Sequence, residues 1–392
     1  MKNETSQVFR ARWLLPITAP PIPGGWIRVA GGEVVEVGSK SLPLDAVDLG
    51  EIALLPGLVN AHTHLEFSDF SEPIGHPGIS LNQWIGMVIS SRGQANPTQK
   101  QHAISVGMRE MASTGTVLAG EISTPPCDYP DEGPQLIRFS EVVGLDSKRG
   151  DERFAAARAM IDVDDQAAIS PHAPYSTPWS LIERCVDLAY STNRPLAMHI
   201  AESPAERELL RNGRGEFAEA LKSLGVWQKG LFPWGDQPLI RLIQLLSRTR
   251  RSLVIHGNDL SDREIDVMAR YPNLTVVYCP RTHHFFRYPD HPVARLQAAG
   301  VRVALGTDSR ASNPDLNLWK EVQYLLRHRM DLSPGKVLEM ATVNGARGLG
   351  NTQYGELRVG SAAVFGGVST TASSVEQLVA DLAENDFQPI KY

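Results

Sequence analysis

The stretch LLPGLVNAHTHLEFS, residues 54–68, decides the fold of this chain. An apolar run ends here in two histidines, His62 and His64. On a β-strand, residues two apart lie on the same face, so both imidazoles can reach one ion. Neutral imidazole is a good ligand for zinc, iron or nickel. An isolated pair of this kind is more often two polar turn residues, and the apolar run before it is what favours a strand-end metal site.

Seven further apolar runs in the middle of the chain have the character of buried parallel strands. Helix-like segments separate most of the runs, among them LNQWIGMVISSR at 81–92 and WSLIERCVDLAYS at 179–191. Eight strand–helix units predict an α/β fold, the (β/α)8 TIM barrel. The predicted strands are 54–64, 115–122, 136–145, 166–175, 195–201, 252–258, 273–279 and 301–307.

The two ends of the chain differ from its middle. WIRVAGGEVVEVGS at 26–39 joins two short apolar runs through Gly-Gly, as a β-hairpin does. GELRVGSAAVFGGVS at 355–369 has a similar short-strand pattern. We therefore predict a small β-sandwich domain formed by residues 1–53 together with 351–392, beside a barrel over 54–350.

The bulk composition excludes several classes of protein. The 392 residues are 42% hydrophobic and 21% charged, with a formal net charge of −6. An acidic chain without a basic block is a poor partner for nucleic acid or an anionic membrane, and no apolar run is long enough for a bilayer span. Widely spaced cysteines without a CxxC pattern predict reduced thiols in a cytoplasmic protein: Cys127, Cys185 and Cys279. The oligomeric state stays open, with a homodimer as one option.

Polar residues fall at the ends of several predicted strands, where a barrel of this type builds its site. His172, His199 and His256 lie at three such ends, and Asp308 ends VRVALGTD. A buried carboxylate after an apolar run needs a partner or a metal to offset its desolvation. Glu202 follows His199 by three residues, close enough to carry protons at the same site. The alternatives are a turn-forming role for Asp308 and a first-turn, helix-dipole role for Glu202.

The motifs HTH after PGLVNA, then HIAES, VIHG and GTDS, occur in this order along the chain. In these motifs the chain resembles the amidohydrolase superfamily, within the branch of cytosine, guanine and adenosylhomocysteine deaminases and chlorohydrolases. The resemblance covers nearly the whole chain. It implies catalytic roles for Glu202, His256 and Asp308. It also implies one divalent ion, zinc in the first place and iron as the other choice, bound by His62, His64, His199 and Asp308.

The chemistry implied by the resemblance is hydrolytic deamination. A bound cation lowers the pKa of its water to about 7, and Asp308 would take a proton from that water. The water would attack a ring carbon that carries an amino group, and Glu202 would protonate the adjacent ring nitrogen and help to release ammonia. His256 would hydrogen-bond the developing tetrahedral oxygen. The fourth predicted strand has His172 and no lysine that could bridge two ions, so one metal is expected.

The expected substrate contacts rest on the same resemblance. HTHLEFS, LNQWIGMVISSR and CPRTHHFF look most like the aminodeoxyfutalosine deaminase members of the branch. Trp84 could stack on a ring and the arginines could bind a carboxylate, although a core Trp84 and a solvated Arg92 are equally ordinary. LNQWIGMVISSR has no glutamate of the kind that holds ribose hydroxyls in adenosylhomocysteine deaminases, which disfavours that substrate. The contacts implied are His172, Glu66, Trp84, Arg92, Arg281 and His283.

Three functions compete on these grounds. The first is a hydrolytic deaminase of a small 6-aminopurine nucleoside-like molecule. The second keeps the site but releases chloride or an amine from a triazine-like or other N-heterocycle. The third is a non-catalytic scaffold of the same fold, which the complete set of expected ligands and proton carriers disfavours.

Overall fold

The computed structural model describes residues 6–41, 43–94 and 96–392. At its centre, eight parallel strands form one sheet in the order of the chain. A parallel bridge between Thr63 and Asp308 joins the last strand to the first. The sheet therefore closes, and the prediction of a TIM barrel is confirmed. Its strands are β8 (Leu58–Thr63), β9 (Thr116–Ser123), β10 (Gln135–Val142), β11 (Ala167–Pro171), β12 (Leu196–Ile200), β13 (Ser252–His256), β14 (Leu274–Tyr278) and β15 (Arg302–Leu305).

The first predicted strand, 54–64, is two strands rather than one. Ile52–Pro56 forms β7 in an accessory sheet, and Leu58–Thr63 forms β8 in the barrel. Gly57 lies between them, where a Cβ atom would come within 2.4 Å of Cγ1 of Val117. This close approach needs glycine. Because the strands on both sides of Gly57 are buried, the apolar run is continuous and its pattern does not reveal the change of sheet.

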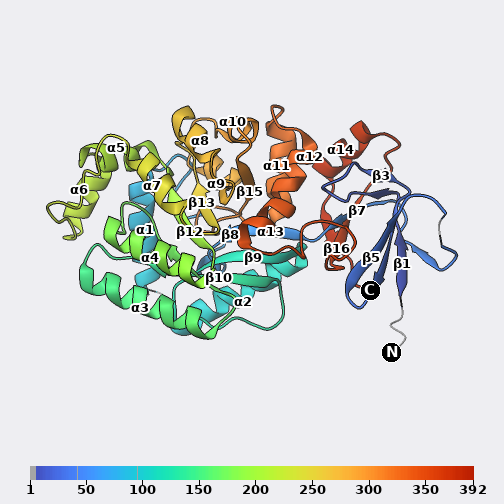
Figure 1. The fold of residues 1–392 in the computed structure, drawn as a ribbon, viewed down its shortest axis with the longest axis horizontal. Coiled ribbons are helices and arrows are strands. Elements are labelled where there is room, and N and C mark those ends of the chain that lie inside the picture. The colour runs from blue at the N-terminus through green and yellow to red at the C-terminus, as the bar shows by residue number, and fades with distance from the viewer. Residues whose placement is uncertain (1–5, 42, 95) are drawn as a thin grey trace.

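Helices alternate with the strands and surround the barrel (Figure 1). Ser203 caps α5 by accepting a hydrogen bond from the N–H of Glu206, and Pro204 follows as the first helical residue, as expected. In the described chain no helix combines the length and the apolar character that a membrane crossing requires. The helices of the barrel are α1 (Leu81–Gln94), α2 (Pro97–Ser113), α3 (Ser147–Val163), α4 (Trp179–Thr192), α5 (Pro204–Asn212), α6 (Glu216–Ser223), α7 (Pro238–Leu246), α8 (Asp262–Met268), α9 (Pro280–Phe285), α10 (Val293–Ala298), α11 (Leu318–His328), α12 (Pro334–Met340) and α13 (Val343–Leu349), with a 3-10 turn at Leu65–Phe67.

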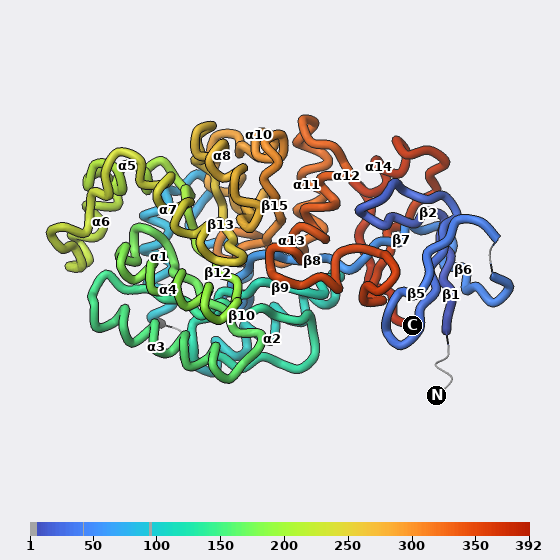
Figure 2. Tube along the Cα trace, viewed as in Figure 1, coloured from blue at the N-terminus to red at the C-terminus, as the bar shows by residue number. Residues whose placement is uncertain are grey.

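Residues from both terminal parts of the described chain build accessory sheets on one side of the barrel, where the strands from residue 7 onward lie close to the C-terminal residues (Figure 2). The predicted hairpin is confirmed as an antiparallel pair, β4 with β5, and β16 from the C-terminal part pairs antiparallel with β7. Phe9, Leu54 and Phe365 share one apolar core, so the two ends fold together. One sheet has the order β5-β4-β1-β6 and the other β17-β16-β7-β2-β3. The remaining bounds are β1 (Gln7–Arg10), β2 (Trp13–Leu14), β3 (Ile22–Pro23), β4 (Trp26–Ala30), β5 (Glu33–Gly38), β6 (Ala46–Asp48), β16 (Phe365–Ser369), α14 (Val375–Glu384) and β17 (Phe387–Pro389).

Candidate active site

Three histidines come together at the carboxyl ends of the barrel strands. His62 lies in β8, His64 follows this strand, and His199 lies in β12. One ring nitrogen from each lies within 4.8 Å of the other two, and all three residues are buried. Because burial removes water from the charged form, it lowers the pKa of all three imidazoles, to about 3 for His62. The histidines are therefore neutral, which is the form that binds a cation.

Asp308 joins this group just after β15. Its Oδ1 atom lies 3.5 Å from Nε2 of His62 and 3.7 Å from Nε2 of His64. Its Oδ2 atom accepts a hydrogen bond of 2.8 Å from Oγ of Ser312, and its backbone carbonyl accepts one of 3.0 Å from Oγ1 of Thr63. Asp308 does turn the chain, with a φ of 56°. Its carboxylate nevertheless has one oxygen fixed and the other facing the ring nitrogens.

The chemistry of this donor set fits a divalent cation. Among the described residues, neither ring nitrogen of His62 has a hydrogen-bond partner, and Nδ1 of His64 also has none. Buried polar atoms are almost always paired, so unpaired nitrogens that face one another indicate a site for a cation. Nδ1 of His199 donates to the carbonyl of His172 at 2.9 Å, which leaves Nε2 of His199 as a donor atom for the ion. Imidazole nitrogens with one carboxylate suit zinc or iron.

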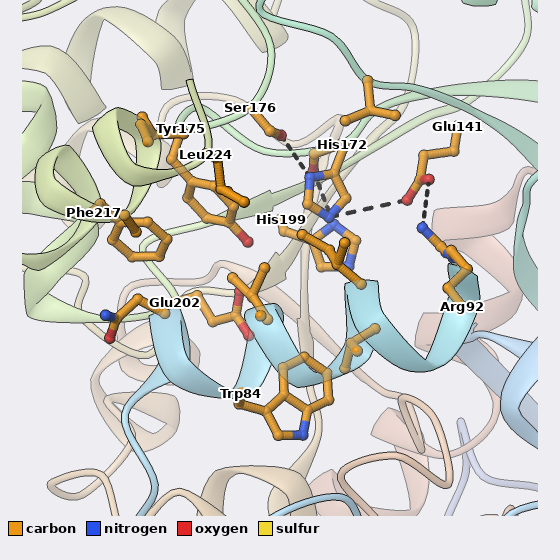
Figure 3. A pocket seen from close by; sticks show the side chains of 18 of the residues that line it. Trp84, Arg92, Glu141, His172, Tyr175, Ser176, His199, Glu202, Phe217 and Leu224 are labelled. Atoms are coloured by element: carbon orange, nitrogen blue, oxygen red, sulfur yellow. Dashed lines mark hydrogen bonds and ion pairs between the residues drawn. The ribbon is translucent and has the colours of Figure 1, made fainter. Parts of the chain in front are cut away.

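Glu202 and His256 face each other beside these residues. Oε1 of Glu202 lies 3.4 Å from Nε2 of His256. Because Ser203 is the N-cap of α5, Glu202 lies before the helix, and its side chain points into the cavity (Figure 3). Burial raises the pKa of Glu202, and the nearby charge of Asp308 adds to this. A carboxyl group with a raised pKa can carry a proton near neutral pH.

The backbone that presents Glu202 is held by a second carboxylate that we did not predict. Oε1 of Glu206 accepts from the N–H of Ala201 at 2.8 Å, and Oε2 accepts from the N–H of Glu202 at 3.1 Å. Nδ2 of Asn258 donates to the carbonyl of Glu202 at 3.0 Å. The sequence feature that could have indicated this role is the position of Glu206 in the first turn of α5, where free backbone N–H groups favour a carboxylate.

A cavity of about 490 Å³ opens above these groups. His64, His199, Glu202, His256 and Asp308 are part of its lining, and so the cavity reaches the proposed metal ligands. Apolar side chains from α1, α6 and the adjoining loops form the walls, among them Trp84, Ile85, Val88, Ile89, Leu145, Phe217, Leu221 and Leu224. The site is therefore polar at its base and apolar around its mouth.

Two predicted substrate contacts, His172 and Trp84, line this cavity. The hydroxyl of Ser176 donates to the carbonyl of Ala173, so Nδ1 of His172, 2.6 Å from Oγ of Ser176, donates to that oxygen. Burial lowers the pKa of His172, and a neutral ring with its proton on Nδ1 keeps Nε2 as an acceptor. Trp84 lines the wall and, partly buried, also packs against the core. Its Nε1 donates to the carbonyl of Ala311 at 3.1 Å.

Arg92 lines the cavity too, and its charge is balanced by buried carboxylates. Its Nη1 atom lies 3.4 Å from Oε2 of Glu141 (Figure 3), and its Nη2 atom forms an ion pair with Glu66. Glu66 does not appear in the lining that the described residues form. We did not predict Glu141, although it lies near the end of β10, where the strand-end rule would place a functional group.

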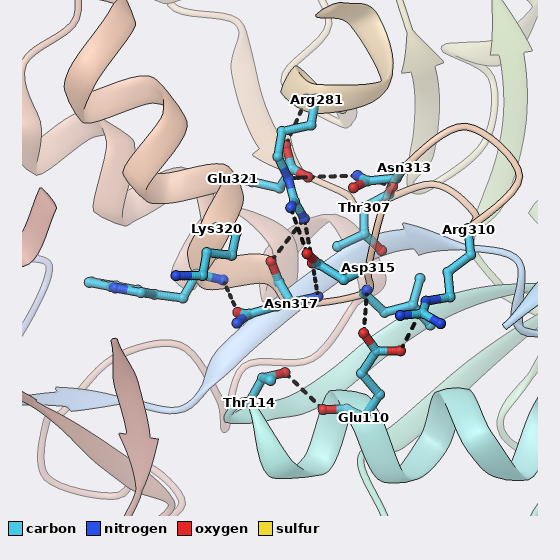
Figure 4. Close-up of polar contacts among 12 residues, drawn as sticks. Glu110, Thr114, Arg281, Thr307, Arg310, Asn313, Asp315, Asn317, Lys320 and Glu321 are labelled. Atoms are coloured by element: carbon cyan, nitrogen blue, oxygen red, sulfur yellow. Dashed lines mark hydrogen bonds and ion pairs between the residues drawn. The ribbon is translucent and has the colours of Figure 1, made fainter. Parts of the chain in front are cut away.

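Arg281 and His283 lie outside the cavity lining found in the described part of the chain. Nε of Arg281 donates to Oε1 of Glu321 at 2.7 Å, and its two terminal nitrogens bind Asp315 at 2.6 and 2.9 Å (Figure 4). The guanidinium is therefore paired with the carboxylates of Asp315 and Glu321, which follow Asp308 in the chain. His283 packs edge-on against Tyr278. We therefore leave Arg281 and His283 out of the proposed substrate contacts.

The fold and the site together define a class of protein. A closed parallel barrel with buried histidines and carboxylates gathered at the carboxyl ends of its strands is a barrel hydrolase with a candidate site for a divalent metal. Residues 53–386 match the Amidohydrolase family, and the chain belongs to this family.

Known proteins agree with this placement. The chain is 28% identical over 377 residues to a 5-methylthioadenosine/S-adenosylhomocysteine deaminase of Halalkalibacterium halodurans. This alignment covers 88% of this chain and 81% of the relative. The chain is also 28% identical over 311 residues to an aminodeoxyfutalosine deaminase of Nitratiruptor sp., covering 76% and 74%. The crystal structure of Helicobacter pylori aminofutalosine deaminase in complex with methylthio-coformycin superimposes with a TM-score of 0.83. That match has 22% identity and covers 98% of this chain and 100% of that chain.

Proposed function

We propose that this protein is a hydrolytic deaminase of a 6-aminopurine nucleoside-like small molecule, of the aminodeoxyfutalosine or adenosine type. The observation that carries the proposal is the pairing of Glu202 with His256 beside His62, His64, His199 and Asp308 at the base of one cavity. The two relatives, named as a 5-methylthioadenosine/S-adenosylhomocysteine deaminase and an aminodeoxyfutalosine deaminase, support the choice of ring and leaving group.

One divalent cation fits the base of the cavity, with zinc as the first choice and iron as the second. His62, His64, His199 and Asp308 would hold it. When bound, such a cation lowers the pKa of a coordinated water to about 7, so that a nucleophile is available at neutral pH.

The chain's own residues then move the protons. Oδ1 of Asp308 takes a proton from the attacking water, while Ser312 keeps Oδ2 in place. Burial raises the pKa of Glu202, and in its protonated form this group donates to the ring nitrogen next to the reacting carbon. The ionised Glu202 then takes up the proton of the new hydroxyl group, while Asp308 passes the proton that it took from the water to the amino group, which leaves as ammonia. His256 donates from Nε2 to the oxygen that develops at that carbon. In the neutral ring, Nε2 of His172 accepts a hydrogen bond from the heterocycle.

The size and walls of the cavity suit a nucleoside. A volume of about 490 Å³ lies within the range of small-molecule sites, roughly 300–1,000 Å³. The apolar walls around Trp84, Phe217 and Leu221 exclude water from the reacting atoms and contact an apolar part of the substrate. Arg92 provides a positive group in one wall, held in place by Glu141 and Glu66.

The test is a metal assay of the purified protein combined with an ammonia-release screen over 6-aminopurine nucleosides. We expect about one divalent ion per chain and turnover of at least one of these nucleosides. Chloride or amine release from triazines, without turnover of any nucleoside, would instead establish the second candidate function. A protein that neither retains metal nor turns over either panel would be the non-catalytic scaffold.

A further inference from the structure

His291 is a buried histidine with no part in the mechanism above. It precedes α10 and is 1% exposed. Its Nε2 atom lies 2.9 Å from the backbone carbonyl oxygen of His256. Because a carbonyl oxygen can only accept, His291 donates this hydrogen bond and carries its ring proton on Nε2. Burial lowers the pKa of His291, so the ring is neutral. The Nε2–H group is then the single N–H group of the ring.

The carbonyl that His291 holds belongs to an uncommon backbone turn. His256 has a φ of 69° and Gly257 a φ of 66°, which places two successive residues in the left-handed region. Glycine adopts this region freely, whereas a histidine does so at a cost and needs surrounding contacts to keep it there. The turn ends β13 and sets the direction in which the His256 ring leaves the strand. Any loosening of the turn therefore moves Nε2 of His256 relative to Glu202.

His291 is itself fixed from both sides. Its ring stacks on Tyr278 of β14, with ring centroids 3.8 Å apart and an interplanar angle of 18°. Its backbone carbonyl accepts a hydrogen bond of 3.2 Å from Arg329. Because stacking fixes the ring of His291 and Arg329 fixes its backbone, the Nε2–H group of His291 has a defined position from which to hold the turn at His256.

We propose that His291 is a positioning residue, whose Nε2–H group holds the left-handed turn at His256 and thereby directs the His256 ring at Glu202 and the reacting oxygen. The catalytic part of this inference rests on the proposed function. The anchoring of the turn does not, and it can be measured separately.

Two substitutions separate the donor from the ring. His291→Phe keeps a ring to stack on Tyr278 and removes the N–H group, whereas His291→Gln removes the ring and keeps an N–H group at a similar reach. We expect kcat of His291→Phe to fall about ten- to a hundred-fold with KM nearly unchanged, because a small misplacement of a catalytic group acts mainly on the transition state. His291→Gln should retain most of the activity.

Hydrogen exchange gives a readout that needs no turnover. The N–H of Gly257 donates to the carbonyl of Ile200 at 3.0 Å, and the N–H of Asp259 donates to the carbonyl of Ala201 at 2.8 Å. Both should exchange faster in His291→Phe and at nearly the wild-type rate in His291→Gln. Unchanged exchange and kcat in His291→Phe, or a His291→Gln variant as impaired as His291→Phe, would overturn the proposal.

The two proposals can fail separately. If the wild type deaminates no nucleoside, the proposed function fails, while the exchange rates still decide whether His291 anchors the turn. If His291→Phe does not fold, His291→Asn replaces it, because its shorter amide cannot reach the His256 carbonyl. His291→Gln should then protect the turn and His291→Asn should not, and equal exchange in both would refute the anchoring role.

Discussion

The base and the mouth of the cavity are built in different ways. At the base, the candidate ligands lie on or just after strands. Two of them have a second contact, His199 with the carbonyl of His172 and Asp308 with Ser312. At the mouth, the walls come from helices and loops, and some of their apolar side chains are exposed to solvent. Leu224 is 57% exposed and Ile89 is 50% exposed.

This difference separates what the protein must keep from what it can vary. The groups at the base are buried, so a change there removes a ligand or a proton carrier. At His199 and Asp308 it also leaves a hydrogen-bond partner unsatisfied. A substitution at Ile89 or Leu224 costs little, since these two side chains are already half in water. We therefore expect the reaction to depend on the base and the choice of substrate to depend on the mouth.

Removal of a ligand at the base should have the largest effect. In His199→Ala the cation loses one of three imidazoles, and we expect more than about a hundred-fold weaker metal binding together with the loss of measurable turnover. Metal content after dialysis and ammonia release measure the two effects. The matched control is His102→Ala, which removes an exposed histidine on α2. Metal retained at the wild-type level in His199→Ala would remove His199 from the ligand set.

Loss of the proton carrier should spare the metal. In Glu202→Gln the side chain keeps its size but can no longer give a proton to the ring nitrogen, so kcat should fall about 10²- to 10⁴-fold. The metal content should equal that of the wild type. Glu216→Gln on α6 serves as the control, because Glu216 is exposed. Turnover close to the wild-type value in Glu202→Gln would refute the role of Glu202.

The carboxylate that holds the Glu202 backbone should affect stability in a pH-dependent way. Burial raises the pKa of Glu206 to about 7 from its ordinary value of 4.5. Between these values the unfolded chain releases the proton first, so ionisation favours the unfolded state as the pH rises. Glu206→Gln does not titrate. The free energy of unfolding of the wild type should therefore fall by about 3 kcal/mol relative to this variant between pH 4.5 and pH 7.

Denaturant unfolding of the metal-free protein at several pH values measures this difference. Glu216→Gln, which replaces an exposed carboxylate, should follow the wild type across the same range. Curves for the wild type and Glu206→Gln that run parallel with pH would show that Glu206 has no raised pKa in the folded protein.

The same contrast explains how much of the molecule could be predicted from its sequence. Strands of a barrel end where their apolar runs end, and so the local pattern alone predicts that His62, His199 and Asp308 lie at one edge of the barrel. Arg281 also follows a strand end, but it became a candidate through the family resemblance of CPRTHHFF. Its actual partner, Glu321, lies 40 residues further along the chain, and a pairing over that distance leaves no local signal.

Two other features were hidden for related reasons. Gly57 divides one apolar run between two sheets, because burial on both sides gives both strands the same composition. His291 reaches a backbone carbonyl, and a carbonyl has no sequence signature at all. The walls of the mouth depend on how α1 and α6 pack at the barrel rim, which helix periodicity alone does not specify.

The smallest effect is expected at the mouth. Leu224→Ser removes apolar surface that faces the cavity but is mostly in solvent, so folding should be unchanged within about 0.5 kcal/mol. Contact with an apolar part of a bound nucleoside would be lost, and KM should rise about three- to ten-fold with kcat nearly constant, which corresponds to about 1 kcal/mol of uniform binding. Leu44→Ser, at a fully exposed leucine outside the cavity lining of the described residues, is the matched control. A fall in kcat as large as that of Glu202→Gln would mean that the mouth takes part in the reaction, and the separation between base and mouth would no longer hold.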